Sequence, residues 1–600
     1  MIEIAFANDC DSLTWENYLH VHGILDRLQL PAGDSFWLFS PENSDMALFT
    51  DSTACKTANH DNLLGQIREG RVDVLHGIGA FGKTPTYPDR EEIQRAFDYL
   101  DKQNCAIKIW SNHGNKNHVH NIAAQGVRTY QQGDLPYSEH FVLDIAQSYG
   151  IEFFWLSHNL RFSLNAPFRI LRDELTPSGA SITTFTRFAP DWTTNAWTVQ
   201  EMITRESLER AIATKQNVIY FTHWGTRGKD ADESQPLFRR ASLAALALLA
   251  DMQACGEIRV VRLVDLLQKE RHRSLNDEIE RISLWQLQTE HCDLDNYYKI
   301  QFEPAKISYF SDLTSGLGIR GKAMLDAGGG AGNLSFPATT HFETVVCLDT
   351  STKALEAGAA IANGLQLDSV LFQQGSLEDP KFPAQTFDAI CARGVLHLVD
   401  HDIVLREFHS IMRPGGTAFI TVNGDGFYQH AICDKNMNIA QYSRLLWNTL
   451  HRRIGGDVNL ISLLDSNAVQ TAALHGGEDE LLDIILDIGD VRCAEVMRKY
   501  QPELKMHVGT YIASHLMLLA SRKGFVLNEM QRERAAKAMQ PEQKRWTCHY
   551  PEEFADEAHK TGFKLFTWRQ QSAFSTAQAP YLEPDTHHGL LKMWYAFLVR

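Results

Sequence analysis

The sequence predicts an α/β protein of two domains, a parallel sheet or barrel followed by a second α/β domain with a helical insertion. Three observations lead to this fold class. The chain has 600 residues, which is too long for one hydrophobic core. Apolar strand-like runs alternate with helical patterns over residues 1–268, as in parallel β-structure. A second alternating pattern begins near Ala323 and contains a glycine-rich loop.

The composition is that of an ordinary globular chain, with 44% hydrophobic and 22% charged residues. The formal net charge of −17 disfavours nucleic acid and anionic membranes as general partners. Ten cysteines occur without a CxxC pair, which indicates reduced thiols and a cytoplasmic location. The N-terminal residues lack a basic start and a long apolar run, so we expect no signal peptide, and no segment is apolar enough for a membrane span.

The elements of the first half are predicted from their periodicity. Apolar runs predict strands at 2–7, 35–40, 72–79, 106–112, 151–157, 217–225 and 258–267. Amphipathic patterns predict helices at 15–28, 60–70, 89–103 and 141–150. The charged stretch 269–290 is predicted to be one bridging helix between the domains.

Polar side chains follow several of these predicted strands. Asp9 and Asp11 come after the first strand, and His76, His113 and His223 stand at the ends of later ones. Because chemistry in parallel barrels is built at the carboxyl ends of the strands, we expect these side chains to meet at one rim. Aspartate and histidine are ligands of divalent metals such as zinc, so the pattern predicts a metal with one carboxylate and one histidine left for catalysis.

Four stretches carry a remote resemblance to the polysaccharide deacetylase family. They are Ala7–Asp11, His76–Ala80, Asn112–Asn115 and Thr222–His223. The resemblance covers residues 1–268 and implies a distorted (β/α) barrel.

The same resemblance implies roles for five residues. Asp9 would be the general base and His223 the acid, with Asp11, His76 and His113 holding the metal. Which of Asp9 and Asp11 is the base and which the metal ligand stays open, because the two aspartates are adjacent in the family and are separated here by Cys10. The alternative is that the two aspartates only cap the helix that starts near Ser12.

The strongest motif of the chain is the loop that runs from Asp326 to Gly332. Gly328, Gly330 and Gly332 stand at alternate positions after a short apolar strand, where they allow a tight turn and close approach of a ligand. A second strand ends in Asp349, placed to bind ribose hydroxyls. The turn 413–416, Arg-Pro-Gly-Gly, precedes a fifth strand.

In this order the motifs resemble the class I S-adenosylmethionine-dependent methyltransferases, over residues 291–600, with a Rossmann-like fold. The resemblance implies that the cofactor is bound by Asp326, Gly328, Gly330, Gly332, Asp349, Ser376, Leu377 and Arg393. Ser376 and Leu377 stand where many members have an aspartate for the adenine. Tyr297 and Tyr298 precede the first strand and, by the same resemblance, would close over the cofactor.

His397 is the candidate general base for the methyl acceptor, since it follows the fourth strand; a capping or packing role is the alternative. The helical insertion at about 425–548 is expected to cover the acceptor site, or else to form an oligomer contact. The rival class for this domain is a NAD-type Rossmann enzyme.

Together the two halves predict a bifunctional enzyme that deacylates and methylates one glycan precursor, of the kind used in surface-polysaccharide or natural-product assembly. One alternative is a methyltransferase with a catalytically degenerate, carbohydrate-binding barrel. An RNA methyltransferase is disfavoured by the charge balance and by the lack of a basic-aromatic stripe.

Overall fold

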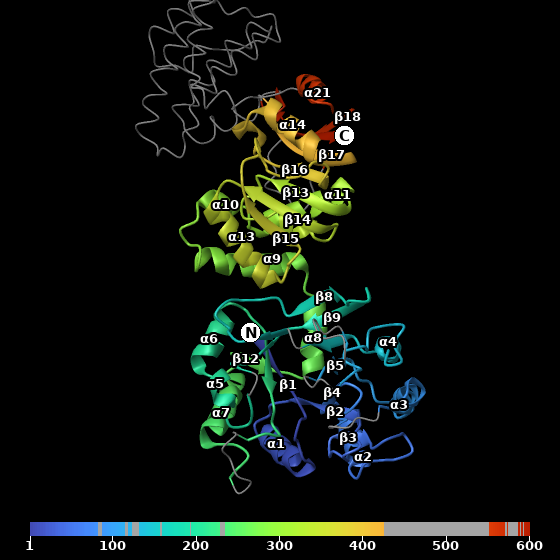
Figure 1. The fold of residues 1–600 in the computed structure, drawn as a ribbon. Helices are drawn as coiled ribbons and strands as arrows, with labels where there is room; N and C mark the ends of the chain where they lie inside the picture. Colours follow the sequence, from blue (N-terminus) through green and yellow to red (C-terminus); the bar gives the residue numbers. More distant parts are fainter. Residues whose placement is uncertain are drawn as a thin grey trace, which may run out of the picture. The chain divides into compact units, whose positions relative to one another are not determined.

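The computed structural model describes residues 1–81, 87–113, 118–122, 131–156, 159–191, 194–227, 235–424, 551–570, 573, 586–587, 590–591 and 593–600. The chain divides into two compact units, Met1–Glu290 with Asn363–Gln366, and His291–Ala362 with Leu367–Arg600. We describe each unit by itself (Figure 1).

The first unit is built on a mixed sheet whose strands are mostly parallel. Its strands are β1 (Ile2–Asn8), β2 (Gly33–Phe39), β3 (Ala47–Phe49), β4 (Val72–Leu75), β5 (Ile109–Ser111), β6 (Phe153–Trp155), β7 (Leu160–Arg161), β8 (Leu171–Leu175), β9 (Ser181–Phe185), β10 (Arg187–Phe188), β11 (Val218–Thr222) and β12 (Ile258–Val260). Their order is β7-β10-β11-β1-β2-β4-β5-β6-β9-β8, with β12 on β1 and β3 on β2. Only the hairpin of β8 and β9 is antiparallel.

The register of this sheet is strongly staggered. Asn8, at the end of β1, pairs with Asp34 near the start of β2, and Asp34 pairs with Val72 at the start of β4. Such stagger is what strands in a barrel require. The pairings among the described strands nevertheless run as an open path from β7 to β8, so barrel closure stays a prediction.

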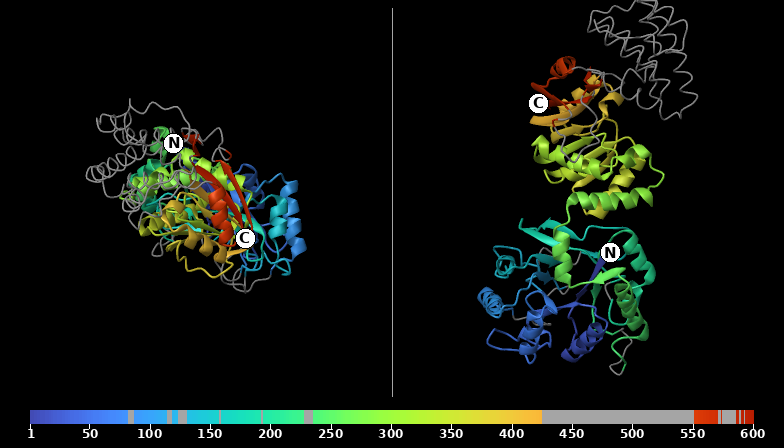
Figure 2. Two further views of the ribbon diagram at one scale, coloured as in Figure 1. Left: turned by 90° about the horizontal axis from the view of Figure 1, so that it is seen from above. Right: turned by 180° about the vertical axis from the view of Figure 1, so that it is seen from behind.

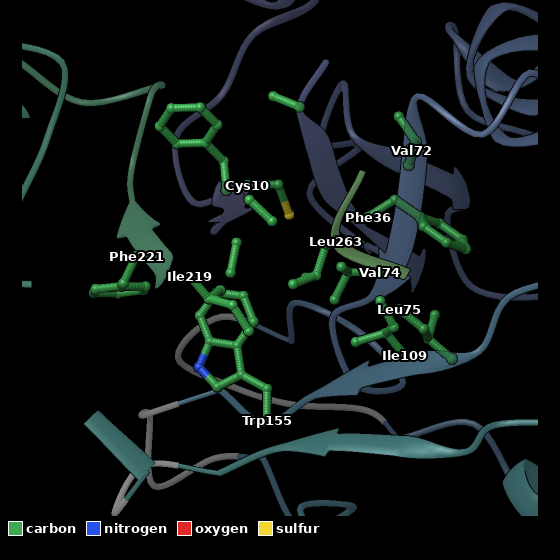
Figure 3. Packing of buried hydrophobic residues seen from close by; sticks show 14 of the residues in the cluster. Cys10, Phe36, Val72, Val74, Leu75, Ile109, Trp155, Ile219, Phe221 and Leu263 are labelled. Atoms are coloured by element: carbon green, nitrogen blue, oxygen red, sulfur yellow. The ribbon is translucent and has the colours of Figure 1, made fainter. Parts of the chain in front are cut away.

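Helices pack around this sheet (Figures 1 and 2). They are α1 (Trp15–Arg27), α2 (His60–Arg68), α3 (Arg90–Lys102), α4 (Leu143–Tyr149), α5 (Val199–Met202), α6 (Arg205–Ala213), α7 (Arg240–Ala254), α8 (Leu263–Arg271) and α9 (Leu275–Gln288). The central strands are buried on both faces: β1, β2 and β11 are buried at every position. Figure 3 shows part of this core, including Phe36, Val74, Ile219 and Phe221.

Two sequence predictions for this unit need correction. The run 258–267 is strand only at Ile258–Val260, and Leu263 already starts α8. The single bridging helix at 269–290 is two helices, because α8 ends at Arg271 and Ser274 caps α9 through a reciprocal capping box with Asp277. The cap supplies acceptors for the free N–H groups of a new helix start, which fixes the break.

The second unit has a seven-stranded sheet. Its strands are β13 (Gly321–Ala327), β14 (Phe342–Asp349), β15 (Val370–Gln374), β16 (Phe387–Ala392), β17 (Met412–Asn423), β18 (Leu565–Gln570) and β21 (Met593–Val599). The order is β15-β14-β13-β16-β17-β21-β18, and β21 is antiparallel to both neighbours. A short pair, β19 (Thr586–His587) and β20 (Leu590–Leu591), lies outside this sheet.

The helices of this unit are α10 (Asn296–Ile300), α11 (Pro304–Leu317), α12 (Ser335–Ala338), α13 (Thr352–Leu365), α14 (His401–Ile411) and α21 (Pro551–Lys560), with a 3-10 turn η2 (Leu396–Leu398). The turn predicted at 413–416 is not separate from the fifth strand, because β17 already starts at Met412 and includes these residues. The insertion predicted at 425–548 lies outside the described residues. Within the described part of the chain, no helix has the length and hydrophobicity to cross a membrane.

Candidate functional site

The glycine loop of the second unit joins β13 to α12 at the centre of the sheet, where the strand order reverses. This is the switch point at which open α/β sheets bind ligands. Gly328 and Gly330 have positive φ of 71° and 57°. A Cβ on Gly330 would lie 2.9 Å from Tyr298, and one on Gly328 would lie 2.6 Å from Val395. The loop therefore needs glycine both for its backbone and for its close contacts.

Two aspartates hold this loop in place. The Gly330 amide donates to Asp349 Oδ2 at 2.9 Å, and the Ser351 amide donates to Asp349 Oδ1 at 2.8 Å. The Ser335 hydroxyl donates to Asp326 Oδ2 at 2.6 Å. Burial raises the pKa of Asp326 to about 7, and the nearby Asp349 charge adds to the effect.

A pocket beside the loop is lined by Tyr297, Tyr298, Asp326, Gly328, Gly330 and Arg393, among others. The Arg393 guanidinium lies 4.7 Å from the Phe310 ring and 5.5 Å from the Tyr309 ring. A larger depression lined by Arg320, Lys322 and His341 lies at the amino ends of β13 and β14. Ligands of such sheets bind at the carboxyl ends, so we assign the site to the pocket beside the loop.

The remaining predicted cofactor residues fall near this pocket or in the core. Gly332 belongs to the loop and has φ of 83°. The Gly375 amide donates to the Asp349 carbonyl at 3.0 Å, which brings the Ser376 turn beside the end of β14. The side chain of Leu377 packs in the hydrophobic core, so only its backbone is available to a ligand. His397 lies in η2, and its side chain is outside the described part.

In the first unit the structure brings five predicted residues together. Asp9 and Asp11 follow β1, His76 follows β4, His113 follows β5 and His223 follows β11. Together with Cys10, these side chains form three overlapping groups that are spaced to hold a metal ion: Asp9, Cys10 and His76; Asp11, His76 and His113; Asp9, Asp11 and His223. They meet although they stand up to about two hundred residues apart, because adjacent parallel strands place their carboxyl ends together.

The contacts within this cluster separate two subsets. His113 Nε2 lies 2.9 Å from Asp11 Oδ2, and His76 Nδ1 lies 3.9 Å from Asp11 Oδ1. His223 Nε2 lies 3.4 Å from Asp9 Oδ2. His76 Nδ1 also lies 3.3 Å from Asp9 Oδ1. The spacing therefore pairs His113 with Asp11 and His223 with Asp9, and it leaves His76 in contact with both carboxylates.

Protonation follows this division. Burial lowers the pKa of His76 to about 3, so it is neutral at pH 7, the form in which imidazole binds metals. Burial also lowers the pKa of His223, but the Asp9 charge and hydrogen bond outweigh it and the net pKa is raised. For Asp9, burial raises the pKa, but the His223 charge and hydrogen bond prevail and the net pKa is lowered.

The alternative that Asp9 and Asp11 cap α1 does not fit the contacts. The helix starts at Trp15, and its cap is Thr14, whose side chain accepts from the Asn17 amide. Asp9 accepts instead from the Asp11 amide at 3.1 Å.

Sequence reasoning missed three residues that shape this site. Arg187, in β10, is 1% exposed; its Nη2 donates to the Leu156 carbonyl at 2.8 Å, and its guanidinium lies 4.2 Å from the Trp155 ring. Burial lowers its pKa, and the Asp9 charge opposes that shift. Trp37 stacks on His76 at a centroid distance of 4.0 Å.

The third missed residue is Asn8, which links the ends of β1 and β11. Its Oδ1 accepts from the Thr222 hydroxyl at 3.1 Å and from the Trp224 amide at 2.8 Å. Its amide group donates to Asp34. Asn8 precedes Asp9, and its two partners flank His223. Its side chain thereby holds the end of β1 against the end of β11. The sequence signal for Asn8 is its place at the end of an apolar run, directly before Asp9.

Known proteins agree with the geometry of the second unit. Residues 325–420 match the methyltransferase domain family. Over these residues the second unit is therefore similar to a methyltransferase domain, in agreement with its open α/β sheet. The match includes Asp326, the glycine loop and Asp349.

Individual relatives cover only part of this chain. An uncharacterized protein of Mycobacterium tuberculosis is 33% identical over 112 residues, 18% of this chain and 40% of that protein. The ubiquinone biosynthesis O-methyltransferase of Escherichia coli O157:H7 is 30% identical over 140 residues, 22% of this chain and 57% of that protein. The chain thus spans about half the length of these relatives.

A solved structure, geranyl diphosphate C-methyltransferase from Streptomyces coelicolor in complex with S-adenosyl-L-homocysteine, is 21% identical to this chain. The match covers 20% of this chain and 45% of the chain in that structure, with a TM-score of 0.19.

Proposed function

We propose that the protein is a methyltransferase that takes its methyl group from S-adenosylmethionine in the pocket of the second unit. The observation that carries this proposal is the glycine loop held by Asp349 at the switch point of the sheet. The cofactor supplies a methyl group on a sulfonium, already a good leaving group, so much of the rate comes from positioning the acceptor. An acceptor hydroxyl or amine attacks the methyl carbon and loses a proton, for which His397 is the candidate base.

Calorimetric titration tests this proposal. We expect the protein to bind S-adenosylmethionine in preference to NAD, and Asp349→Ala to weaken binding by about 1–3 kcal/mol through lost hydrogen bonds. Glu343→Ala is the matched control, because Glu343 is an exposed acid on the same strand. Preferential binding of NAD, or unchanged affinity in Asp349→Ala, would overturn the assignment.

A second activity is favoured by the cluster in the first unit. We propose that it is a metal-dependent N-deacylase that acts on a glycan precursor, whose free hydroxyl or amine the second unit methylates. The donor set fits a divalent metal such as zinc, since neutral imidazole and carboxylate are its usual ligands. A metal held by Asp11, His76 and His113 would supply Lewis-acid polarisation of the acyl carbonyl.

The protein's own residues carry the protons of this reaction. Asp9 takes a proton from the attacking water, and the C–N bond of the amide breaks. His223, protonated beside Asp9, gives its proton to the leaving amine. The products are a carboxylic acid and a free amine.

Metal content and acetate release from an N-acetylated oligosaccharide test this activity together. His76→Ala and His113→Ala should each lose the metal, whereas His223→Ala should keep it and stop deacylation. His272→Ala, at an exposed position after α8, is the control. A metal-free wild-type protein that still binds the sugar would favour the degenerate, carbohydrate-binding alternative.

A further inference from the structure

Cys10 lies between the two aspartates and inside the metal-binding cluster. Its side chain is 1% exposed and belongs to the buried core of the first unit (Figure 3). Its backbone N–H donates to the Ser35 hydroxyl at 2.9 Å, which fixes the residue against β2. The backbone of Cys10 is therefore fixed at the position from which its thiol extends.

The thiol faces His76, the histidine that two of the three candidate metal groups share. Cys10 Sγ lies 3.5 Å from His76 Nδ1, and Asp9 Oδ1 lies 3.3 Å from the same nitrogen. In a tetrahedral zinc site with bonds of usual length, a nitrogen ligand and a sulfur ligand lie about 3.5 Å apart. A nitrogen ligand and an oxygen ligand of such a site lie about 3.4 Å apart. The observed distances agree with both values. The donor atoms of Asp9, Cys10 and His76 all lie within 4.8 Å of one another.

We propose that Cys10 Sγ is a ligand of the metal that His76 Nδ1 holds in the first unit. The inference rests on the proposed metal site, in the arrangement in which Asp9 is the carboxylate ligand and Asp11 the base, and it adds a sulfur donor to a set otherwise made of nitrogen and oxygen. On binding, the S–H bond breaks, the sulfur–metal bond forms and the proton leaves to the solvent. A thiolate selects zinc and cobalt over magnesium and calcium, which prefer oxygen ligands.

Cobalt substitution reports a sulfur ligand directly. A cobalt(II) ion bound by thiolate shows a sulfur-to-metal charge-transfer band in the near ultraviolet, besides visible bands that depend on coordination geometry. We expect the full chain titrated with Co²⁺ to show both. Cys10→Ser should lose the near-ultraviolet band, keep weaker visible bands, and bind Co²⁺ more than about tenfold less tightly, because even outer residues of metal sites contribute that much. Cys255→Ser, at an exposed cysteine of the same unit, should behave as wild type.

The outcomes distinguish this inference from the site on which it rests. Visible Co²⁺ bands without a charge-transfer band in the wild-type protein would overturn the role of Cys10 and leave the metal site standing. A complete absence of Co²⁺ binding would overturn the metal site itself. Because the wild-type spectrum alone separates these outcomes, the test holds even if Cys10→Ser folds poorly. A charge-transfer band that persists in Cys10→Ser and disappears in Cys255→Ser would identify Cys255 as the sulfur ligand. That result would also overturn the inference.

Discussion

At the scale of single residues, burial and the charge of the nearest partner together determine which carboxylates of this protein are charged. Asp326 and Asp73 are both almost fully buried, and burial raises the pKa of each to about 7. Asp9 is also buried, but the His223 partner keeps its pKa low. The difference lies in the partner, because a neighbouring cation offsets the lost hydration of a carboxylate and a hydroxyl donor does so only in part.

The pKa of Asp326 predicts how cofactor affinity depends on pH. The carboxylate lines the pocket, and in the proposed cofactor complex we expect its charged form to attract the amino group of S-adenosylmethionine. Because the pKa of Asp326 is about 7, this carboxyl group is protonated in the free protein below pH 7. Binding of the cofactor to the charged form must then release that proton. We expect affinity to rise by up to about tenfold per pH unit between pH 5.5 and 7 and then to level off.

Calorimetry at pH 5.5, 6.5 and 7.5 checks this dependence. In Asp326→Asn the affinity should be lower at pH 7.5 and nearly independent of pH. A wild-type affinity that is flat over this range would contradict the assigned role of the carboxylate.

Asp73 predicts a pH dependence of stability in the first unit. Its pKa is raised by burial and by the Asp34 charge, so between the unfolded value near 4 and the folded value of about 7 the folded state holds the extra proton. Stability must therefore fall as pH rises through this window, and the penalty is complete above pH 7. Asp73→Asn removes the charge with little change in shape. We expect it to stabilise the unit by on the order of 2–4 kcal/mol more at pH 8 than at pH 5.

Urea unfolding of the full chain at the two pH values measures this difference. Asp251→Asn, at an exposed position of α7, is the control and should show no such difference. An equal effect of Asp73→Asn at both pH values would show that the buried carboxylate is not charged at pH 8.

At the scale of elements, the sequence predicted those parts whose pattern is local. The strands that carry Asp9, His76, His113 and His223 are apolar runs buried on both faces, so both the strands and the polar residues after them were readable. The hairpin of β8 and β9 was missed, because β8 reads Leu-Arg-Asp-Glu-Leu and is partly exposed. Arg187 was missed for a related reason: a two-residue strand has no periodicity, and an arginine is expected at the surface.

The break between α8 and α9 gives a prediction for one element. The Ser274 hydroxyl accepts from the Asp277 amide at 3.1 Å, and the Asp277 side chain accepts from the Ser274 amide at 3.2 Å. Ser274→Ala removes one half of this box and should destabilise the first turn of α9 by about 1 kcal/mol. Hydrogen exchange of the amides in that turn should become about fivefold faster.

Gln288→Ala is the matched control, since Gln288 is exposed in the last turn of the same helix. Faster exchange throughout α8 and α9 together would indicate instead that the two helices unfold as one element.

At the scale of the whole molecule, each unit has its own hydrophobic core and its own candidate site. The candidate metal cluster comes from residues 9–223, and the pocket beside the glycine loop is lined by residues between 297 and 393. Sites that share no residues and no partners usually respond additively to mutation. We therefore expect His76→Ala with His113→Ala to remove the metal and leave the affinity for S-adenosylmethionine unchanged within about 0.5 kcal/mol. A larger change in cofactor affinity on metal loss would show that the two sites are coupled.

Independent binding still allows the two reactions to depend on each other through the substrate, and this dependence identifies the methyl acceptor. His223→Ala should stop deacylation while the metal and the cofactor stay bound. If the acceptor is the amine freed by the first unit, methylation of an N-acetylated substrate should stop in this variant, and supplying the deacylated sugar should restore it. If the acceptor is a hydroxyl, methylation should continue without deacylation. Mass spectrometry of the products distinguishes the two acceptors. Loss of methylation on both the acetylated and the deacylated sugar would contradict the proposal that one glycan passes through both sites.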